Sequence, residues 1–162
     1  MMRSALLLGL ALALVGGTAT AQDHPDFSGT WKLNAIKSDA MRGRGGQMGA
    51  PRDIILTINQ TADELNIEQE MGQNARKLTY YLDGRESTNA GMRGGESKST
   101  AKWDGKSLVI ETTATFEGPQ GSMTMKSKEV RTLSDDGKTM TVTTTTESPR
   151  GTNTRKTVFD KQ

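Results

Sequence analysis

Residues able to do acid–base, nucleophilic or metal chemistry are few in this sequence. His24 is the only histidine, and there is no cysteine. A Ser–His or Cys–His nucleophile pair is therefore not expected inside the folded domain. Asp135 and Asp136 are adjacent carboxylates, but they stand directly before Gly137, where a solvated hairpin turn is expected. No phosphate loop, zinc-ligand spacing or dinucleotide fingerprint occurs. The sequence predicts a protein that is not an enzyme and uses no cofactor.

A pair of opposite charges interrupts one otherwise apolar strand face. If every second residue after Met123 points the same way, Glu129 and Arg131 point inward with it. Buried charges must be paired, and a polar group inside an apolar cavity orients the head group of a ligand. A β-bulge near Lys128 would instead turn Val130 inward and both charges outward. The sequence leaves both alternatives open.

One metal site is conceivable at the N-terminus of the processed chain. Cleavage after Ala21 would leave Gln22, Asp23 and His24 as the first three residues. A free amine, two backbone nitrogens and an imidazole in third position form a square-planar set suited to Cu(II) or Ni(II). Many tails carry a histidine by chance, and an N-terminal Gln cyclises, so the alternative is an ordinary tail.

Alternation with a period of two is the main signal after residue 22. Apolar side chains occupy every second position in six or more stretches, which predicts strands with one buried and one wet face. The inward sets are Ile54, Leu56 and Ile58; Leu65, Ile67 and Met71; Leu78, Tyr80 and Leu82; Ala101 and Trp103; Leu108, Ile110, Thr112, Ala114 and Phe116; and Met140, Val142, Thr144 and Thr146. No stretch predicts a long amphipathic helix.

Turn residues divide these stretches into consecutive hairpins. Asp-Gly pairs at 83–84, 104–105 and 136–137 supply the positive φ of tight turns. Residues 62–63 and 149–151 mark two more. About eight to ten strands in sequential hairpins predict an all-β, antiparallel up-and-down barrel.

A barrel of this size is either filled by side chains or holds one small ligand. Its expected interior is rich in methionine, which is common on adaptable apolar binding surfaces. The cavity candidates are Tyr80, Trp103, Phe116, Met123, Met125, Glu129, Arg131 and Met140. A filled core made of the same residues is the alternative.

Residues 1–21 have the three parts of a secretory signal peptide. Arg3 precedes an apolar run over 5–15, and small residues end in Ala19, Thr20 and Ala21. The run is too short to span a bilayer. We expect cleavage after Ala21, which leaves 22–162 as one domain, secreted or periplasmic. An exported domain without cysteine fits a bacterial periplasm best.

Two glycine-rich basic segments, 41–51 and 91–95, break the strand pattern. Removal of Arg3 with the leader lowers the formal net charge from +2 to +1, which argues against nucleic acid as a partner. We interpret both segments as loops that could lie at the mouth of the barrel. A membrane-spanning barrel is not expected, because the outward face would carry Glu64, Glu68, Lys98, Lys102 and Lys126.

The first strand, 27–33 (FSGTWKL), resembles the Gly-x-Trp signature of lipocalins, in which the Trp closes one end of the barrel. In lipocalins a basic residue of the last strand lies across that Trp, which implies Trp31 with Arg155 or Lys156 as barrel-closing residues. Across nearly the whole mature chain, the segments FSGTWKLN (27–34), STAKWDG (99–105), LSDDGKT (133–139) and VFDK (158–161) resemble a set of uncharacterised exported bacterial proteins described as lipocalin-like. This resemblance implies fold and compartment, and no ligand.

The sequence is compatible with two functions. The first is an exported binding protein that holds a small apolar or amphipathic ligand inside the barrel. The second is a structural or interaction protein with a filled barrel and active surface loops.

Overall fold

Ten antiparallel strands make up the regular structure of this chain. The computed structural model describes residues 24–39, 53–91, 95–118, 121–148 and 151–162. The strands are β1 (Gly29–Leu33), β2 (Ile54–Gln60), β3 (Glu64–Met71), β4 (Asn74–Tyr81), β5 (Glu86–Ala90), β6 (Glu96–Asp104), β7 (Ser107–Gly118), β8 (Gly121–Leu133), β9 (Thr139–Ser148) and β10 (Gly151–Lys161). In these ranges no helix is long and apolar enough to cross a membrane.

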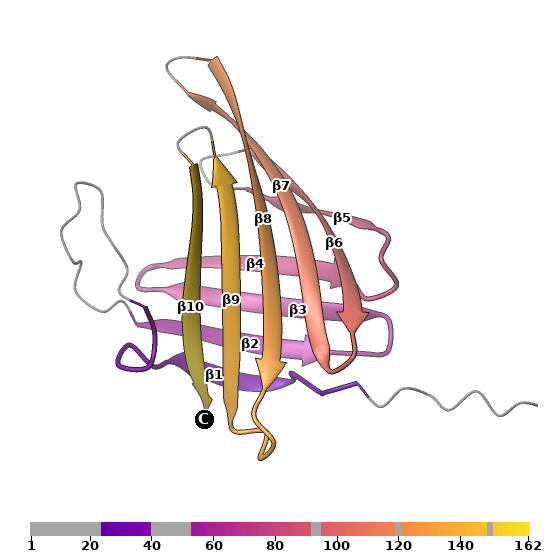
Figure 1. Ribbon diagram of the computed structural model, residues 1–162, viewed down its shortest axis with the longest axis vertical. Coiled ribbons are helices and arrows are strands. Elements are labelled where there is room, and N and C mark those ends of the chain that lie inside the picture. Colours follow the sequence, from indigo (N-terminus) through magenta and orange to yellow (C-terminus); the bar gives the residue numbers. More distant parts are fainter. Residues whose placement is uncertain (1–23, 40–52, 92–94, 119–120, 149–150) are drawn as a thin grey trace, which may run out of the picture.

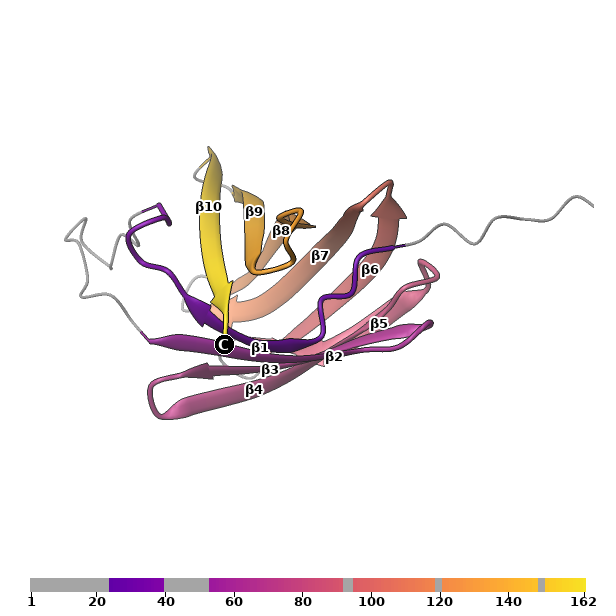
Figure 2. The ribbon, with the colours of Figure 1, turned by 90° about the horizontal axis from the view of Figure 1, so that it is seen from below.

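Strands β1–β4 and strands β5–β10 each pair in sequence order, and the first and last strands join the two groups. Their order in the sheet is β4-β3-β2-β1-β10-β9-β8-β7-β6-β5. β1 pairs with β10 through Trp31 and Lys161, which joins the two ends of the chain (Figure 1). Strands β1–β4 form one layer, and β6–β10 curve over it (Figure 2). The predicted all-β, up-and-down barrel is therefore confirmed, with ten strands.

Two of the three Asp-Gly turns connect hairpins as predicted. Gly105 between β6 and β7 has φ of 59°, and Gly137 between β8 and β9 has φ of 67°. Gly84 also has a positive φ, 86°, but it joins β4 to β5, and no ladder connects these strands among the described residues. The hairpin predicted there is wrong, because the barrel leaves its one unpaired seam at this turn.

A side chain takes the place of the ladder at the seam between β4 and β5. Asn89 Oδ1 accepts a hydrogen bond from the Thr79 backbone N–H at 2.8 Å, and its Nδ2 donates to the Thr79 carbonyl at 2.9 Å. Asn89 is only 8% exposed. The amide thus satisfies both backbone groups of a β4 residue, as a neighbouring strand would.

The closed end of the barrel is filled by aromatic and aliphatic side chains. Trp31 is fully buried, and its indole N–H donates to the Phe27 carbonyl at 2.8 Å. The cation over the Trp31 ring is Lys161, whose Nζ lies 5.2 Å from the ring centroid. The expectation that Arg155 or Lys156 covers Trp31 is therefore wrong. The register explains this, because Lys161 is directly opposite Trp31 in the β1–β10 ladder.

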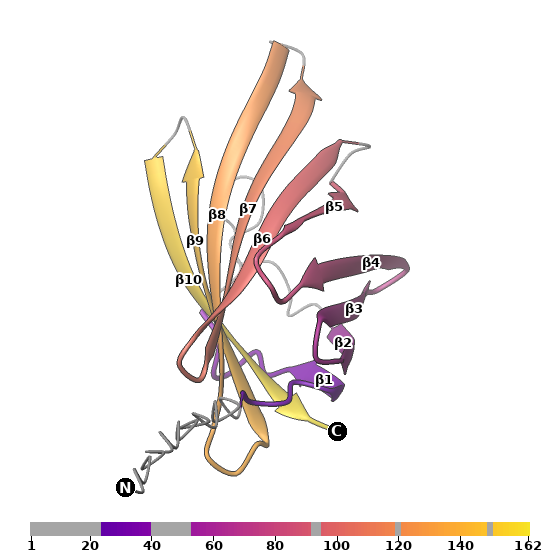
Figure 3. The ribbon, with the colours of Figure 1, turned by 90° about the vertical axis from the view of Figure 1, so that its right-hand side faces the viewer.

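The two groups of strands diverge from this closed end (Figure 3). Most positions predicted to face inward are buried. The buried apolar residues are Phe27, Trp31, Ile54, Leu56, Ile58, Leu65, Ile67, Leu78, Tyr80, Leu82, Ala101, Leu108, Ile110, Met140, Val142, Val158 and Phe159. Many are β-branched or aromatic, which suits a pleated surface buried on one side.

We predict that Asn89→Ala lowers the free energy of unfolding by about 1–3 kcal/mol, because it leaves the N–H and C=O of Thr79 without partners. In urea the midpoint should fall with little change in slope. Asn153→Ala, at an exposed position of β10, is the matched control and should change stability little. Equal midpoints for the two variants would contradict the bridging role of Asn89.

Candidate functional site

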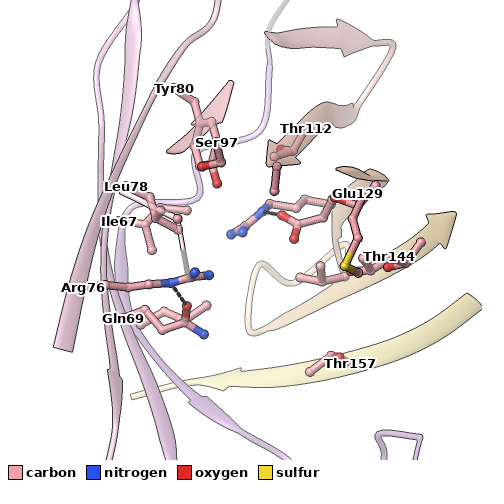
Figure 4. A pocket seen from close by; sticks show the side chains of 18 of the residues that line it. Ile67, Gln69, Arg76, Leu78, Tyr80, Ser97, Thr112, Glu129, Thr144 and Thr157 are labelled. Carbon is pink, nitrogen blue, oxygen red and sulfur yellow. Dashed lines mark hydrogen bonds and ion pairs between the residues drawn. The ribbon is translucent and has the colours of Figure 1, made fainter. Parts of the chain in front are cut away.

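The barrel is hollow between its two layers. A cavity of about 630 Å³ is lined by residues from β2, β3 and β4 on one side and from β6 to β10 on the other. Figure 4 shows Ile67 and Leu78 across this space from Thr112, Glu129 and Thr144. A cavity of this size falls in the range that holds small organic ligands.

Regular alternation on β8 carries two charges into the cavity. Glu129 pairs with Ile110 on β7 and with Thr144 on β9, without a bulge. Arg131, two residues further along, also lines the cavity. Val130 lies between them in the ladder, so its side chain points to the other face. Of the two alternatives left open by the sequence, the structure shows the inward-facing pair.

Arg131 is a buried cation with an N–H donor that no described residue accepts. Its side chain is 6% exposed, and that of Glu129 is 25% exposed. Arg131 Nε donates to Glu129 Oε1 at 2.5 Å, so the pair neutralises charge inside the barrel. Arg131 Nη1 is buried and has no hydrogen-bond partner among the described residues. Such a donor is costly to leave unmatched, and an incoming acceptor would satisfy it.

Two further arginines line the cavity. Arg155 is half-buried, and its Nε is another buried donor without a partner in the described part of the chain. Arg76 donates from Nε to Gln69 Oε1 at 2.8 Å (Figure 4). The described lining residues thus include three arginines, of which Arg76 is exposed, and two carboxylates, those of Glu129 and the exposed Glu96. The charged groups of the wall therefore leave an excess of one positive charge, which favours an anionic guest.

Tyr80 adds a neutral polar group to the same cavity. Burial raises the pKa of its phenol, the charge of Glu129 raises it further, and Arg131 and Arg76 oppose the shift. Because the net direction is upward, the phenol keeps its proton at neutral pH. Its hydroxyl makes no hydrogen bond to any other described residue and is available to a ligand as donor or acceptor.

The cavity brings together five of the eight predicted cavity residues. Tyr80, Phe116, Met125, Glu129 and Arg131 all line it. The predicted barrel-closing residue Arg155 lines it as well.

The other three predicted cavity residues lie elsewhere. Met140 is fully buried in the core, and Trp103 is a half-buried residue packed against the core. Met123 is half-buried beside Phe116 at the far end of β8. The alternating pattern correctly predicted that these three side chains face inward, but it does not predict how far along the barrel axis each side chain lies.

Several lining residues were not singled out from the sequence. They are mostly hydroxyl-bearing, and include Ser97, Thr112, Ser127, Thr144, Thr146 and Thr157, together with Gln69 and Arg76. Alternation already placed Thr112, Thr144 and Thr146 on inward faces. A polar residue at an inward position was the signal that could have identified them. Threonine is so common in strands, however, that its presence there did not distinguish lining residues from other strand residues.

His24 lies against the closed end of the barrel. Its imidazole stacks on Trp103, with ring centroids 4.3 Å apart and planes 3° from parallel. Its Nδ1 is buried and has no partner among the described residues. Gln22 and Asp23 lie outside the described residues, and the rest holds no group of three or more potential metal-ligating side chains. Copper or nickel binding at residues 22–24 stays a prediction.

The glycine-rich segments are only partly described. Residues 40–52 and 92–94 lie outside the described ranges. Gly91 lines the cavity, and its N–H donates to the Gly95 carbonyl at 2.7 Å. The described ends of the second segment therefore lie beside the cavity, and its proposed place at the mouth stays a prediction.

Comparison with known proteins identifies the architecture. No protein-family model matches the sequence, and no curated protein matches it. A fatty acid transporter, REP1-NXSQ, superposes with a TM-score of 0.61 at 15% identity, covering 83% of this chain and 95% of that one. The zebrafish ileal bile acid-binding protein complexed with cholic acid gives 0.61 at 18% identity, covering 84% and 98%.

A secretory abundant heat soluble protein from Ramazzottius varieornatus also gives a TM-score of 0.61, at 14% identity, covering 84% of this chain and 95% of that one. The fold is thus a lipocalin-like barrel. At these identities the likeness shows the fold alone.

We predict that Arg131→Met destabilises the protein by about 3 kcal/mol, because it leaves Glu129 as an uncompensated charge in the barrel. The double variant Glu129→Gln/Arg131→Met should recover most of this loss. Urea unfolding of both variants and the parent measures the coupling. Lys128→Met, at an exposed position of β8 next to Glu129, is the control and should change stability by less than about 0.5 kcal/mol. A double variant no more stable than Arg131→Met would contradict the pairing.

Proposed function

We propose that this protein is an exported, non-enzymatic carrier that holds a small amphipathic anion inside its barrel. The observation that carries the proposal is the buried Nη1 of Arg131, which has no partner in the described part of the chain and belongs to a cavity-lining residue. A carboxylate or similar acid there would receive a charge-assisted hydrogen bond in a setting of low dielectric constant.

The remaining lining supports an amphipathic guest over a wholly polar one. Ile54, Leu56, Ile67 and Leu78 offer apolar surface on one wall, and burying the apolar part of a ligand there is favourable in proportion to its area. Tyr80 lines the same cavity as Glu129 and Arg131. Apolar surface therefore lies close to a polar anchor.

The similar folds support the same class of function by analogy. One is titled as a fatty acid transporter and another as a bile acid-binding protein holding cholic acid. Both titles describe amphipathic acids. For this chain the analogy is secondary to the buried arginine, because fold alone does not fix function.

Export is the second part of the proposal. It rests on residues 1–21, with a basic start, an apolar run and small residues before the expected cleavage site, and on the resemblance to exported bacterial proteins. A periplasmic or extracellular carrier without disulfides is the role that follows.

For the ligand, we predict that the protein binds the fluorescent probe 11-(dansylamino)undecanoic acid about tenfold or more tightly than its methyl ester, because only the free acid pairs with Arg131. Fluorescence titration measures both constants. In Glu129→Gln/Arg131→Met the acid should lose this advantage, whereas Lys128→Met should keep it. Equal binding of acid and ester by the parent protein, or no binding of either, would overturn the proposed function.

For export, we predict that the full-length chain expressed in a Gram-negative bacterium is recovered from the periplasm with Gln22, or its cyclised form, as first residue. Ala19→Arg should block processing, because a small residue is required three positions before the cut. Thr20→Val, between the two small residues, should be processed normally. Intact mass spectrometry distinguishes these products, and an unprocessed parent chain in the cytoplasm would refute export.

A further inference from the structure

The two walls of the cavity differ in chemistry. The wall from β2–β4 presents four aliphatic residues, Ile54, Leu56, Ile67 and Leu78, together with Gln69, Arg76 and Tyr80, and no serine or threonine among its described lining residues. The opposite wall, from β7–β10, also has apolar residues, but it carries in addition the hydroxyl groups of Thr112, Ser127, Thr144, Thr146 and Thr157. Its apolar residues are Ala114, Phe116, Met125, Val142 and Phe159. Figure 4 shows this opposition, with Ile67 and Leu78 on one side and Thr112 and Thr144 on the other.

The hydroxyl-bearing residues are arranged as a regular array. Thr112, Ser127 and Thr146 are neighbours across three adjacent strands. Thr144 lies two residues along β9, opposite Glu129 on one side and Arg155 on the other. Adjacent strands lie about 4.8 Å apart, and residues on one face repeat every ~6.7 Å. The array therefore offers polar groups at intervals of about 5–7 Å beside the charged residues.

Most of these hydroxyls are unused by the protein itself. Thr112 Oγ1 is 2.8 Å from Ser99 Oγ. In contrast, the side chains of Ser127, Thr144, Thr146 and Thr157 make no hydrogen bond to another described residue. A ligand that covered them with methylene groups would take their water away without replacing it, which is unfavourable.

A flexible single acyl chain would therefore leave the hydroxyl groups of β7–β10 without hydrogen-bond partners. We propose that the ligand is a rigid, facially amphipathic acid, with an apolar face against β2–β4, hydroxyl groups on its other face toward β7–β9, and its acidic group at Arg131. A fused-ring polyhydroxylated carboxylic acid has this chemistry. The inference rests on the proposed function and narrows it from amphipathic anions in general to one shape and polarity.

The test compares three carboxylates that differ in hydroxyl groups and rigidity. Cholate carries three hydroxyls on one ring face, lithocholate has a single ring hydroxyl, and palmitate is a flexible chain without any. We expect displacement of the dansyl probe to rank cholate first, about tenfold ahead of lithocholate. Palmitate should bind more weakly than cholate, although its chain is the more apolar of the two.

The variant Ser127→Ala/Thr144→Val removes two hydroxyls from the array and should bring the cholate-to-lithocholate ratio close to one while keeping palmitate binding. Thr143→Val is the matched control. Thr143 alternates with the cavity-lining Val142 and Thr144, so its side chain lies on the opposite face of β9. It should leave the ratio unchanged. Circular dichroism and urea unfolding verify that the variants are folded.

The possible outcomes separate the two proposals. Palmitate binding as tightly as cholate, or a ratio that the double variant leaves unchanged, overturns the facially amphipathic ligand and leaves the anion carrier standing. Absence of binding for all three acids and for the dansyl probe overturns both. A cholate preference that disappears only in the double variant supports the inference.

Discussion

The ladder between β1 and β10 is the interaction on which the rest of the structure depends. It joins the first and last strands and unites two sheets, β1–β4 and β5–β10, that no other ladder connects among the described residues. Trp31 stands in this ladder opposite Lys161, fully buried, with its indole bonded to the Phe27 carbonyl. Two separate sheets of this composition would each expose an apolar face and two edges. The β1–β10 ladder holds the two apolar faces against each other and leaves one seam among the described strands, between β4 and β5.

A cavity that contains Arg131 is hard to explain by stability alone. An apolar residue of similar volume in place of a buried ion pair is often neutral or stabilising. The Arg131–Glu129 pair also leaves Nη1 without an acceptor in the described residues, so the pair does not fully satisfy itself. A filled apolar barrel would be the simpler way to a stable fold. The arrangement makes physical sense when the missing acceptor arrives with a ligand.

Much of this architecture follows from the sequence, because the side-chain period of a strand is two. Period and turn residues were enough to predict an antiparallel barrel and the inward faces of most strands. They could not decide whether Glu129 and Arg131 point inward, since a single extra residue in β8 would reverse both. That question is settled by the pairing of Glu129 with Ile110 and Thr144.

Pairing between distant strands also explains the two errors in the closing regions. Lys161, rather than Arg155, covers Trp31 because of the register of β10 against β1. The turn at Gly84 is not a hairpin because β4 and β5 are the two strands that the closed barrel leaves unpaired. The cation over Trp31 and the unpaired turn at Gly84 both depend on contacts between strands, and the neighbouring residues in the sequence do not indicate either of them.

The threonines of β9 show why the sequence did not indicate which hydroxyl groups line the cavity. The branched side chain of threonine favours strands on either face, and six of the ten residues of β9 are threonine. On the outer face, Thr145 lies 3.0 Å from Thr154 of the next strand, Oγ1 to Oγ1, and the two form a cross-strand pair. On the inner face, Thr144 and Thr146 have no such partner among the described residues and point into the cavity. The same residue type thus serves sheet formation outside and leaves hydrogen-bonding capacity inside, and only closure of the barrel separates the two roles.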